Sequence, residues 1–200
     1  HSVLALEGYS SSRFAPGQGQ ALAERAHVVM ARPSHDAGGH GLTLAHDGWS
    51  RTHGLTHTRT LHLSADGRRL TGQDALGPVT AGERARLSAE LLRRGAEELR
   101  YAVRFHLHPD VEAQVDLGGS AVSLALRSGE VWVFRPFDPS AMTLEPSAYL
   151  ECGRLKPRAA QQIVLAGRID GGEALIGWTL SKAQDTPLAI RDLDRDDPDL

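Results

Sequence analysis

Short runs of apolar or alternating residues, separated by Gly, Pro, Asp and Ser, dominate this 200-residue sequence. The runs recur roughly every 8–12 residues, a spacing typical of an antiparallel sandwich or barrel and not of a parallel sheet with crossover helices. The hairpin around Ser128 and Gly129 is the clearest, because residues alternate on both of its sides. We therefore expect an all-β fold, an antiparallel β-sandwich, with strands over 3–6, 27–31, 42–46, 58–64, 69–73, 101–108, 111–116, 121–126, 131–135, 142–144, 148–151, 161–166 and 175–180.

Residues 80–100 depart from this pattern and favour a helix. Thr80 and Glu83 have the spacing of a capping box, and Gly95 would weaken a helix by about 0.5–1 kcal/mol relative to Ala. The apolar residues recur at helical spacing: Leu87, Leu91, Leu92, Ala96 and Leu99. We expect one short helical insertion or a partly ordered loop near 80–100.

The negative charge of the chain is concentrated at its end. Residues 185–200 hold six Asp and two Arg, a net charge of −4, so residues 1–184 carry about +1. A nucleic-acid-binding surface needs a clustered basic field, and none is visible, so we expect no nucleic-acid partner. We expect one β-sandwich domain over 1–184, surface loops over 10–20 and 33–41, and a mobile acidic tail over 185–200.

Several classes of protein are excluded by simple counts. No apolar run approaches the ~20 residues of a membrane-spanning helix. Cys152 is the only cysteine, so an internal disulfide cannot form. The sequence begins at His1 without the basic and apolar segments of an export signal, and residues 2–6 already have a strand pattern. We expect it to be a piece of a longer protein.

Ten histidines are the most unusual feature of the composition. His53 and His57 have the spacing of a helical zinc face, but Gly54, Thr56 and Thr58 favour an extended chain. On a strand, residues four apart are separated by about 13 Å, too far to share one ion directly. We expect a polar strand face here.

Arg104, His106 and His108 alternate along one predicted strand and form a polar stripe, about 6.6 Å between successive members. The opposite face holds three apolar residues that would pack inward, Val103, Phe105 and Leu107. The stripe is a candidate for contact with a sugar carboxylate or sulfate, or for half of a zinc site with a third ligand such as His62. The alternatives are a solvated strand face and a surface on which another domain docks.

The segment from His46 to His57 is dense in polar side chains. His46 and Asp47 form either a turn or a base with its orienting carboxylate. Trp49 is expected in a loop, where it could stack on a sugar. We place His46, Trp49 and His57 with the stripe as residues of a substrate-binding or domain-docking face. No nucleophile elbow, P-loop or dinucleotide fingerprint is present.

The segment HDGWSRTHGLTHTRTLHLSADGRRLTGQDAL, residues 46–76, resembles a recurrent stretch of the heparinase II/III-like protein family. The shared pattern is a His-Asp-Gly-aromatic turn, then Gly-hydrophobic-x-His-x-Arg, a strand, and a Gly-x-Asp-x-Leu end. Further matches follow in order: HSVL at 1–4, SSSRF at 10–14, VRFHLHPDV at 103–111 and GEVW at 129–132. The resemblance extends from His1 to about Leu180, with residues 80–100 as an insertion.

The resemblance implies the C-terminal β-sandwich of a longer polysaccharide lyase that carries an N-terminal α/α toroid. Such proteins cleave uronic-acid-containing polysaccharides by β-elimination, and their catalytic residues lie in the toroid and just upstream of this sequence. We therefore expect no catalytic residue in this chain. His1 matches a ligand of a structural zinc in the full-length parent, and no zinc is expected in this chain because the other ligands lie upstream.

The resemblance also implies an acidic polysaccharide partner, a docked toroid and a periplasmic or secreted location. We expect the chain to self-associate when the toroid is absent, through the apolar face that it would leave exposed. Two alternatives remain: a non-catalytic carbohydrate-binding or structural module, and a free-standing metal-dependent enzyme that uses the histidines.

Overall fold

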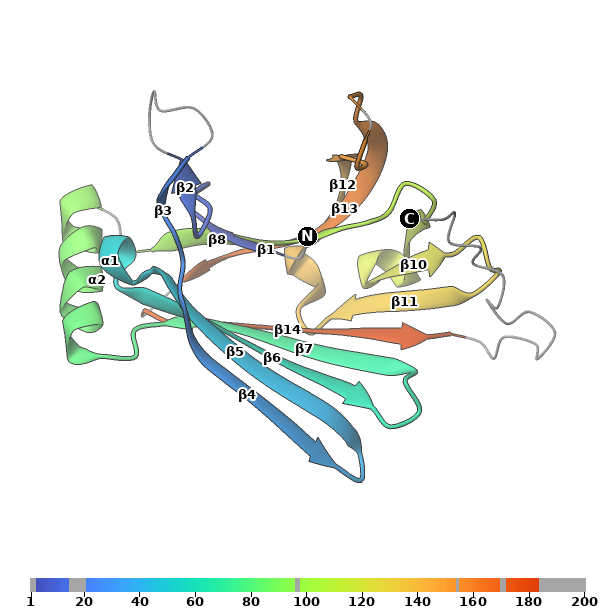
Figure 1. Cartoon of the computed structure of the whole chain (residues 1–200), viewed down its shortest axis with the longest axis horizontal. Helices are drawn as coiled ribbons and strands as arrows, with labels where there is room; N and C mark the ends of the chain where they lie inside the picture. Colours follow the sequence, from blue (N-terminus) through green and yellow to red (C-terminus); the bar gives the residue numbers. More distant parts are fainter. Residues whose placement is uncertain (1–2, 15–20, 96–97, 154, 170–171, 184–200) are drawn as a thin grey trace.

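The computed structural model of the chain describes residues 3–14, 21–95, 98–153, 155–169 and 172–183, and these form two stacked antiparallel sheets with a small hairpin at one end (Figure 1). The predicted antiparallel β-sandwich is thus confirmed. The larger sheet contains, in spatial order, β4 (Val28–Asp36), β5 (Gly39–Trp49), β6 (Leu55–Ser64), β7 (Arg69–Gly77), β14 (Ala174–Lys182), β11 (Val131–Pro136), β10 (Ala121–Ala125) and β9 (Glu112–Asp116).

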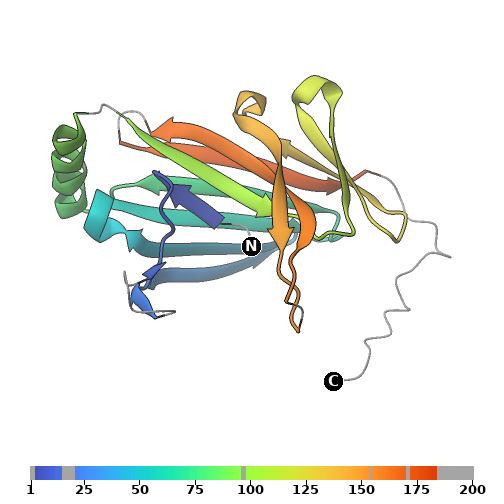
Figure 2. The ribbon, with the colours of Figure 1, turned by 90° about the horizontal axis from the view of Figure 1, so that it is seen from above.

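The smaller sheet covers the middle of the larger one (Figure 2). It contains, in spatial order, β1 (Val3–Leu6), β8 (Leu99–His106), β13 (Arg158–Ile169) and β12 (Met142–Tyr149). Two short strands, β2 (Arg13–Phe14) and β3 (Leu22–Glu24), pair with each other beside the larger sheet. The remaining elements are α1 (Ser50–His53), α2 (Ala81–Arg94) and the 3₁₀ turns η1 (Leu117–Gly119) and η2 (Pro139–Ala141).

The core lies between the two sheets and contains an aromatic cluster. On β8, Val103 and Phe105 point inward as predicted, with 0% and 8% of their surface exposed. The ring of Phe105 lies 4.9 Å from the rings of both Phe134 and Trp178. Gly72 of β7 makes room for this cluster, because a Cβ on it would lie 2.1 Å from the Trp178 ring. Such aromatic pairs add to the hydrophobic gain of burial.

Helix α2 forms at one end of the sandwich, where the sequence predicts a helix. Thr80 Oγ1 accepts from the Glu83 backbone N–H, and the Glu83 carboxylate accepts from the Thr80 N–H, so the predicted capping box is present. Gly95 is the C-cap in a left-handed conformation and not an interior position. Leu99 belongs to strand β8 and not to the helix. The alternative of a loop is therefore wrong for residues 81–94.

Two expectations about local structure are corrected. Residues 33–41 are not a loop but the ends of β4 and β5 with a tight turn, in which Asp36 Oδ1 accepts from the N–H groups of Gly38 and Gly39. Pro33 is tolerated because β4 is an edge strand, where a missing N–H need not break the ladder. The separate strands expected over 142–144 and 148–151 are one strand, β12.

The predicted acidic tail and His1 lie outside the described residues, as do residues 15–20 of the predicted loop over 10–20. Among the helices of the described part, none is both long and apolar enough to cross a membrane.

Candidate functional site

Polar residues from neighbouring strands of the larger sheet form one hydrogen-bonded chain. His46 of β5 lies opposite His57 of β6, and Arg59 of β6 lies opposite Asp74 of β7. His57 Nδ1 is 3.0 Å from His46 Nε2, and His57 Nε2 is 2.7 Å from Asp74 Oδ1. Arg59 Nε donates to Asp74 Oδ1 over 2.7 Å, and Trp178 Nε1 donates to Asp74 Oδ2 over 3.1 Å. We call these five residues the His–Asp network.

The partners of the two imidazoles assign their protons. Asp74 accepts, so His57 Nε2 carries a hydrogen, and the hydrogen of the uncharged His46 ring lies on Nε2, which faces His57 Nδ1. His46 Nδ1 in turn accepts from the Gly48 N–H over 3.2 Å. All four ring nitrogens are therefore engaged. The network cannot offer an imidazole to a substrate or metal without breaking one of these bonds.

The charges in the network are fixed by its environment. Burial alone would raise the pKa of Asp74, but hydrogen bonds from His57 and Arg59 hold that pKa below its ordinary value. Burial, with further contributions from His57 and Arg59, lowers the pKa of His46 to about 4. At neutral pH the network therefore holds an Asp74–Arg59 ion pair and an uncharged His46. Its hydrogen bonds link β5, β6, β7 and β14.

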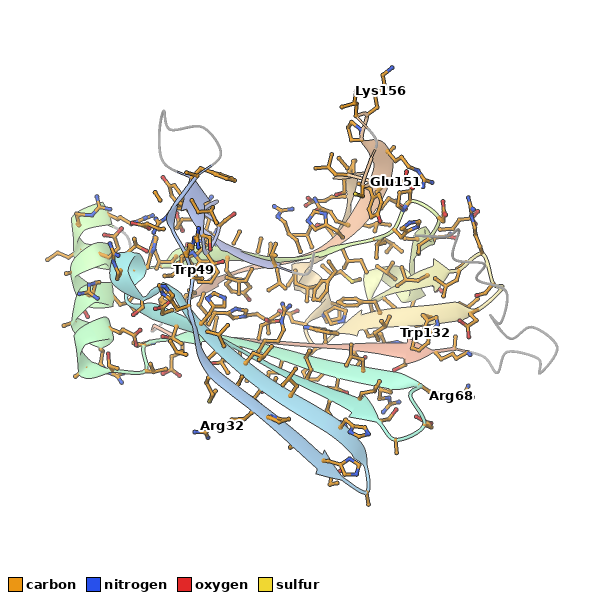
Figure 3. All side chains as sticks on the ribbon, viewed as in Figure 1. Arg32, Trp49, Arg68, Trp132, Glu151 and Lys156 are labelled. Carbon is orange, nitrogen blue, oxygen red and sulfur yellow. The ribbon has the colours of Figure 1, made fainter. Side chains whose placement is uncertain are left out.

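The expectation of an exposed face is wrong for Trp49 and His57, which are buried, while His46 is half-buried. Trp49 is 0% and His57 is 6% exposed, and the Trp49 ring lies 5.3 Å from the His46 ring. A register shift between His46 and Trp49 in the β5–β6 ladder places both rings on the same side. Figure 3 shows Trp49 inside the fold, at the end that carries the helices. Trp49 therefore cannot stack on a sugar.

Arg104 and His106 point outward from the smaller sheet, as predicted, and belong to a second group that we call the outer cluster, completed by Glu145, Ser147 and Gln162. Arg104 Nη1 lies 3.2 Å from Glu145 Oε2, and His106 Nδ1 lies 2.8 Å from Ser147 Oγ. Burial and the nearby Arg104 lower the pKa of His106. Gln162 is 9% exposed, and its Oε1 has no hydrogen-bond partner among the described residues. The exposed His106 ring and the half-buried Arg104 guanidinium are the groups of this cluster that a ligand can reach.

His108 lies beyond the end of β8 and has its own partners. Its ring is 4.9 Å from the Tyr149 ring, and its Nδ1 accepts from the Asp110 N–H over 3.2 Å. Asp110 also pairs with Arg127 and Arg158. The six predicted site residues thus lie in three places. Arg104 and His106 lie in the outer cluster, and His108 lies beyond the end of β8. The remaining three lie in or beside the His–Asp network: His46, Trp49 and His57.

A metal site needs several donor side chains close together. Within the described residues, no group of three His, Cys, Asp or Glu side chains is arranged to hold a metal ion. His62, considered as a third ligand, lies on β6 opposite Gly41 and Thr71, in the sheet that does not contain Arg104. His53 lies in α1 and His57 in β6, so they share no helical face. The described side chains thus do not assemble the zinc site considered for the stripe.

The sequence analysis did not single out Asp74, Glu145, Ser147 or Gln162 as site residues. Asp74 had a signal, because it is the acid of the Gly-x-Asp-x-Leu pattern and Arg59 is the basic residue of the His-x-Arg pattern. The other three join Arg104 and His106 only through the register of β12, β13 and β8. That register could not be inferred from local spacing.

Comparison with known proteins identifies the family. The model of the family "Heparinase II/III-like, C-terminal" matches residues 1–179. The chain therefore belongs to the heparinase II/III-like family and corresponds to its C-terminal domain.

Individual relatives differ in how closely they match. FtsZ-localized protein C from Caulobacter vibrioides is 39% identical over 181 residues, which cover 90% of this chain and 29% of that protein. The heparan sulfate lyase HepC from Pedobacter heparinus has the same fold, with a TM-score of 0.61 at 13% identity, over 94% of this chain and 25% of HepC. A crystal structure of heparinase III gives a TM-score of 0.58 at 13% identity, over 93% of this chain and 24% of that one. The chain thus spans less than a third of the length of each.

Proposed function

We propose that this domain works as the C-terminal β-sandwich of a uronic-acid-specific polysaccharide lyase, where it forms one wall of the sugar cleft and a surface on which the α/α toroid docks. The observation that carries the proposal is the family match over residues 1–179. The fold shared with HepC, a heparan sulfate lyase, supports it. Catalysis belongs to the full-length parent, so this chain alone has no turnover.

The reaction proposed for the parent is β-elimination. A base removes the C5 proton of a uronic acid, an acid protonates the leaving oxygen, and neutralising groups stabilise the carboxylate as charge develops. In this scheme the outer cluster supplies binding. Arg104 offers a guanidinium to a carboxylate, while Nε2 of the exposed His106 ring suits a sugar hydroxyl.

The docking surface proposed for the toroid lies at the start of β4. Val28 and Val29 follow each other there and are both exposed. Neighbouring exposed apolar side chains are typical of an interaction surface. In the isolated chain the same residues would drive self-association. A periplasmic or secreted location and a structural zinc held in part by His1 belong to the same proposal for the parent.

The test uses Arg104→Ala and His106→Ala in the full-length parent, with Arg100→Ala as the matched control. Arg100 lies on β8 with Arg104 but toward the other end of the strand. We expect each outer-cluster variant to lower kcat/KM for an acidic polysaccharide by about tenfold, the size of one lost charged hydrogen bond, and the control to have full activity. Equal activity in all three variants would exclude a binding role for the outer cluster.

A second candidate is a non-catalytic carbohydrate-binding or structural module. The observation that favours it is the 39% identity to a protein named for localisation with FtsZ, against 13% to HepC. In that case the parent would accumulate where FtsZ does and would release no unsaturated product. Imaging of a fluorescent fusion of the parent together with labelled FtsZ, beside the lyase assay, separates the two candidates.

A further inference from the structure

A polar cavity of about 380 Å³ lies beside the β2–β3 hairpin, away from the outer cluster on the smaller sheet. The hairpin forms one side of the cavity and the end of β5 with α1 forms the other. Its described lining includes His27 and five charged residues, Arg13, Glu24, Arg25, Asp47 and Arg51. Among the described residues that line the cavity, His27 is the one with an aromatic ring, so the cavity suits a ligand recognised by charge and hydrogen bonds.

The lining carries an excess of positive charge. Glu24 pairs with Arg13 and lies 3.7 Å from Arg51, so one carboxylate faces two guanidinium groups. Arg25 is exposed and has no ion pair among the described residues. The Arg51 side chain is 84% exposed, and its guanidinium remains available to a ligand. Three arginines against two carboxylates leave a net positive charge before His27 is counted.

Contacts on both sides of the cavity hold its shape. Asp47 Oδ1 accepts from the His27 N–H over 2.7 Å, and this bond lowers the pKa of Asp47, so that carboxylate stays ionised. Ser12 Oγ accepts from the Ala26 N–H over 3.0 Å. Gly48 packs so closely on the hairpin that a Cβ there would lie 2.6 Å from the Ser11 Cβ. The cavity is therefore preformed, as small-molecule sites usually are.

We propose that this arginine cavity binds the acidic group of a sugar, a carboxylate or a sulfate, with Arg25 and Arg51 as the main contacts. Arginine binds planar carboxylates and sulfate-like oxyanions through paired N–H donors. Glu24 and Asp47 are placed to accept hydrogen bonds from hydroxyl groups of the same sugar. The inference rests on the proposed function for the class of ligand, and it adds a second contact point for an acidic chain.

The experiment measures the affinity of this 200-residue chain for three tetrasaccharides by titration calorimetry. The heparin tetrasaccharide carries sulfate and carboxylate, the alginate tetrasaccharide carries carboxylate only, and cellotetraose is the neutral control. The variants are Arg25→Gln, Arg51→Gln and the double variant. The matched control is Arg32→Gln, an exposed arginine on edge strand β4 (Figure 3).

We expect each single variant to weaken binding of an acidic tetrasaccharide by about three- to tenfold and the double variant by more than tenfold, while Arg32→Gln binds like the wild type. Loss with both acidic probes identifies the carboxylate, and loss with heparin alone identifies the sulfate. Unchanged affinity in the double variant, an equal loss in Arg32→Gln, or no binding of either acidic probe overturns the proposal. Lyase activity of the full-length parent is measured separately, so failure of the cavity and failure of the proposed function give different results.

Discussion

Substitution of Asp74 by Asn is the sharpest test of the His–Asp network. Asp74 is 0% exposed and accepts from His57, Arg59 and Trp178. The Asn side chain keeps the size but removes the charge, so the largely buried Arg59 guanidinium, 15% exposed, loses its ion pair with Asp74. Breaking a buried ion pair from one side costs about 3–5 kcal/mol. That is a large part of the about 5–15 kcal/mol that stabilises a typical domain.

The free energy of unfolding is measured by urea denaturation, followed by circular dichroism and tryptophan fluorescence. For a domain of this size the expected loss lowers the Tm by about 6–20 °C. Glu112→Gln is the matched control, because Glu112 is exposed on edge strand β9. Adding Arg59→Met to Asp74→Asn should recover part of the loss, since it also removes the largely buried positive charge. A loss below about 1 kcal/mol in Asp74→Asn would refute the importance given to this network.

Three further predictions concern stability. The pKa of His46 is lowered to about 4, so between pH 6.5 and 4 the unfolded chain binds a proton at His46 and the folded chain does not. The contribution of uncharged His46 to the free energy of unfolding is therefore complete above pH 6.5 and is lost as the pH falls toward 4. The loss is at most about 3 kcal/mol, or about 1–2 kcal/mol after screening by solvent. The difference between the urea midpoints at pH 7 and pH 4.5 should therefore be smaller in His46→Gln than in the wild type. A difference equal to that of the wild type would contradict this prediction. Thr80→Ala removes the helix cap and should cost about 1 kcal/mol, against little for Ser88→Ala within α2, by thermal denaturation. Gly72→Ala forces a methyl group into the Trp178 ring and should cost about 1–3 kcal/mol, with a changed tryptophan emission; wild-type stability would show that the ring can move.

Sequence patterns predicted those helices and strands whose structure depends on residues close together in the sequence. The alternation of Val103, Arg104, Phe105 and His106 assigns one face of β8 to the core, and burial in the structure agrees. The capping box at Thr80 was readable because it depends on two residues only three apart. Pro33 and its glycine neighbours predict a loop from sequence, but proline is tolerated on an edge strand, and the edge position of β4 depends on the whole sheet.

The candidate site was less predictable because it depends on strand order. Asp74 and Trp178 are 104 residues apart and meet only because β14 inserts beside β7. His57 and Trp49 have polar or mixed neighbours in sequence, which suggested exposure, yet the β5–β6 ladder turns both into the core. Burial of a histidine needs a partner, and the partner here comes from another strand.

Release of unsaturated uronate by the full-length parent, followed by ultraviolet absorbance, tests the central claim most directly. The panel is heparin, heparan sulfate, chondroitin and alginate, each offered to the parent and to this 200-residue chain. The account predicts product from the parent on at least one polysaccharide and none from the chain alone, with the fold of the chain confirmed by circular dichroism. The proposed function would be contradicted if the parent released no product from any of the four polysaccharides, or if the chain alone released product.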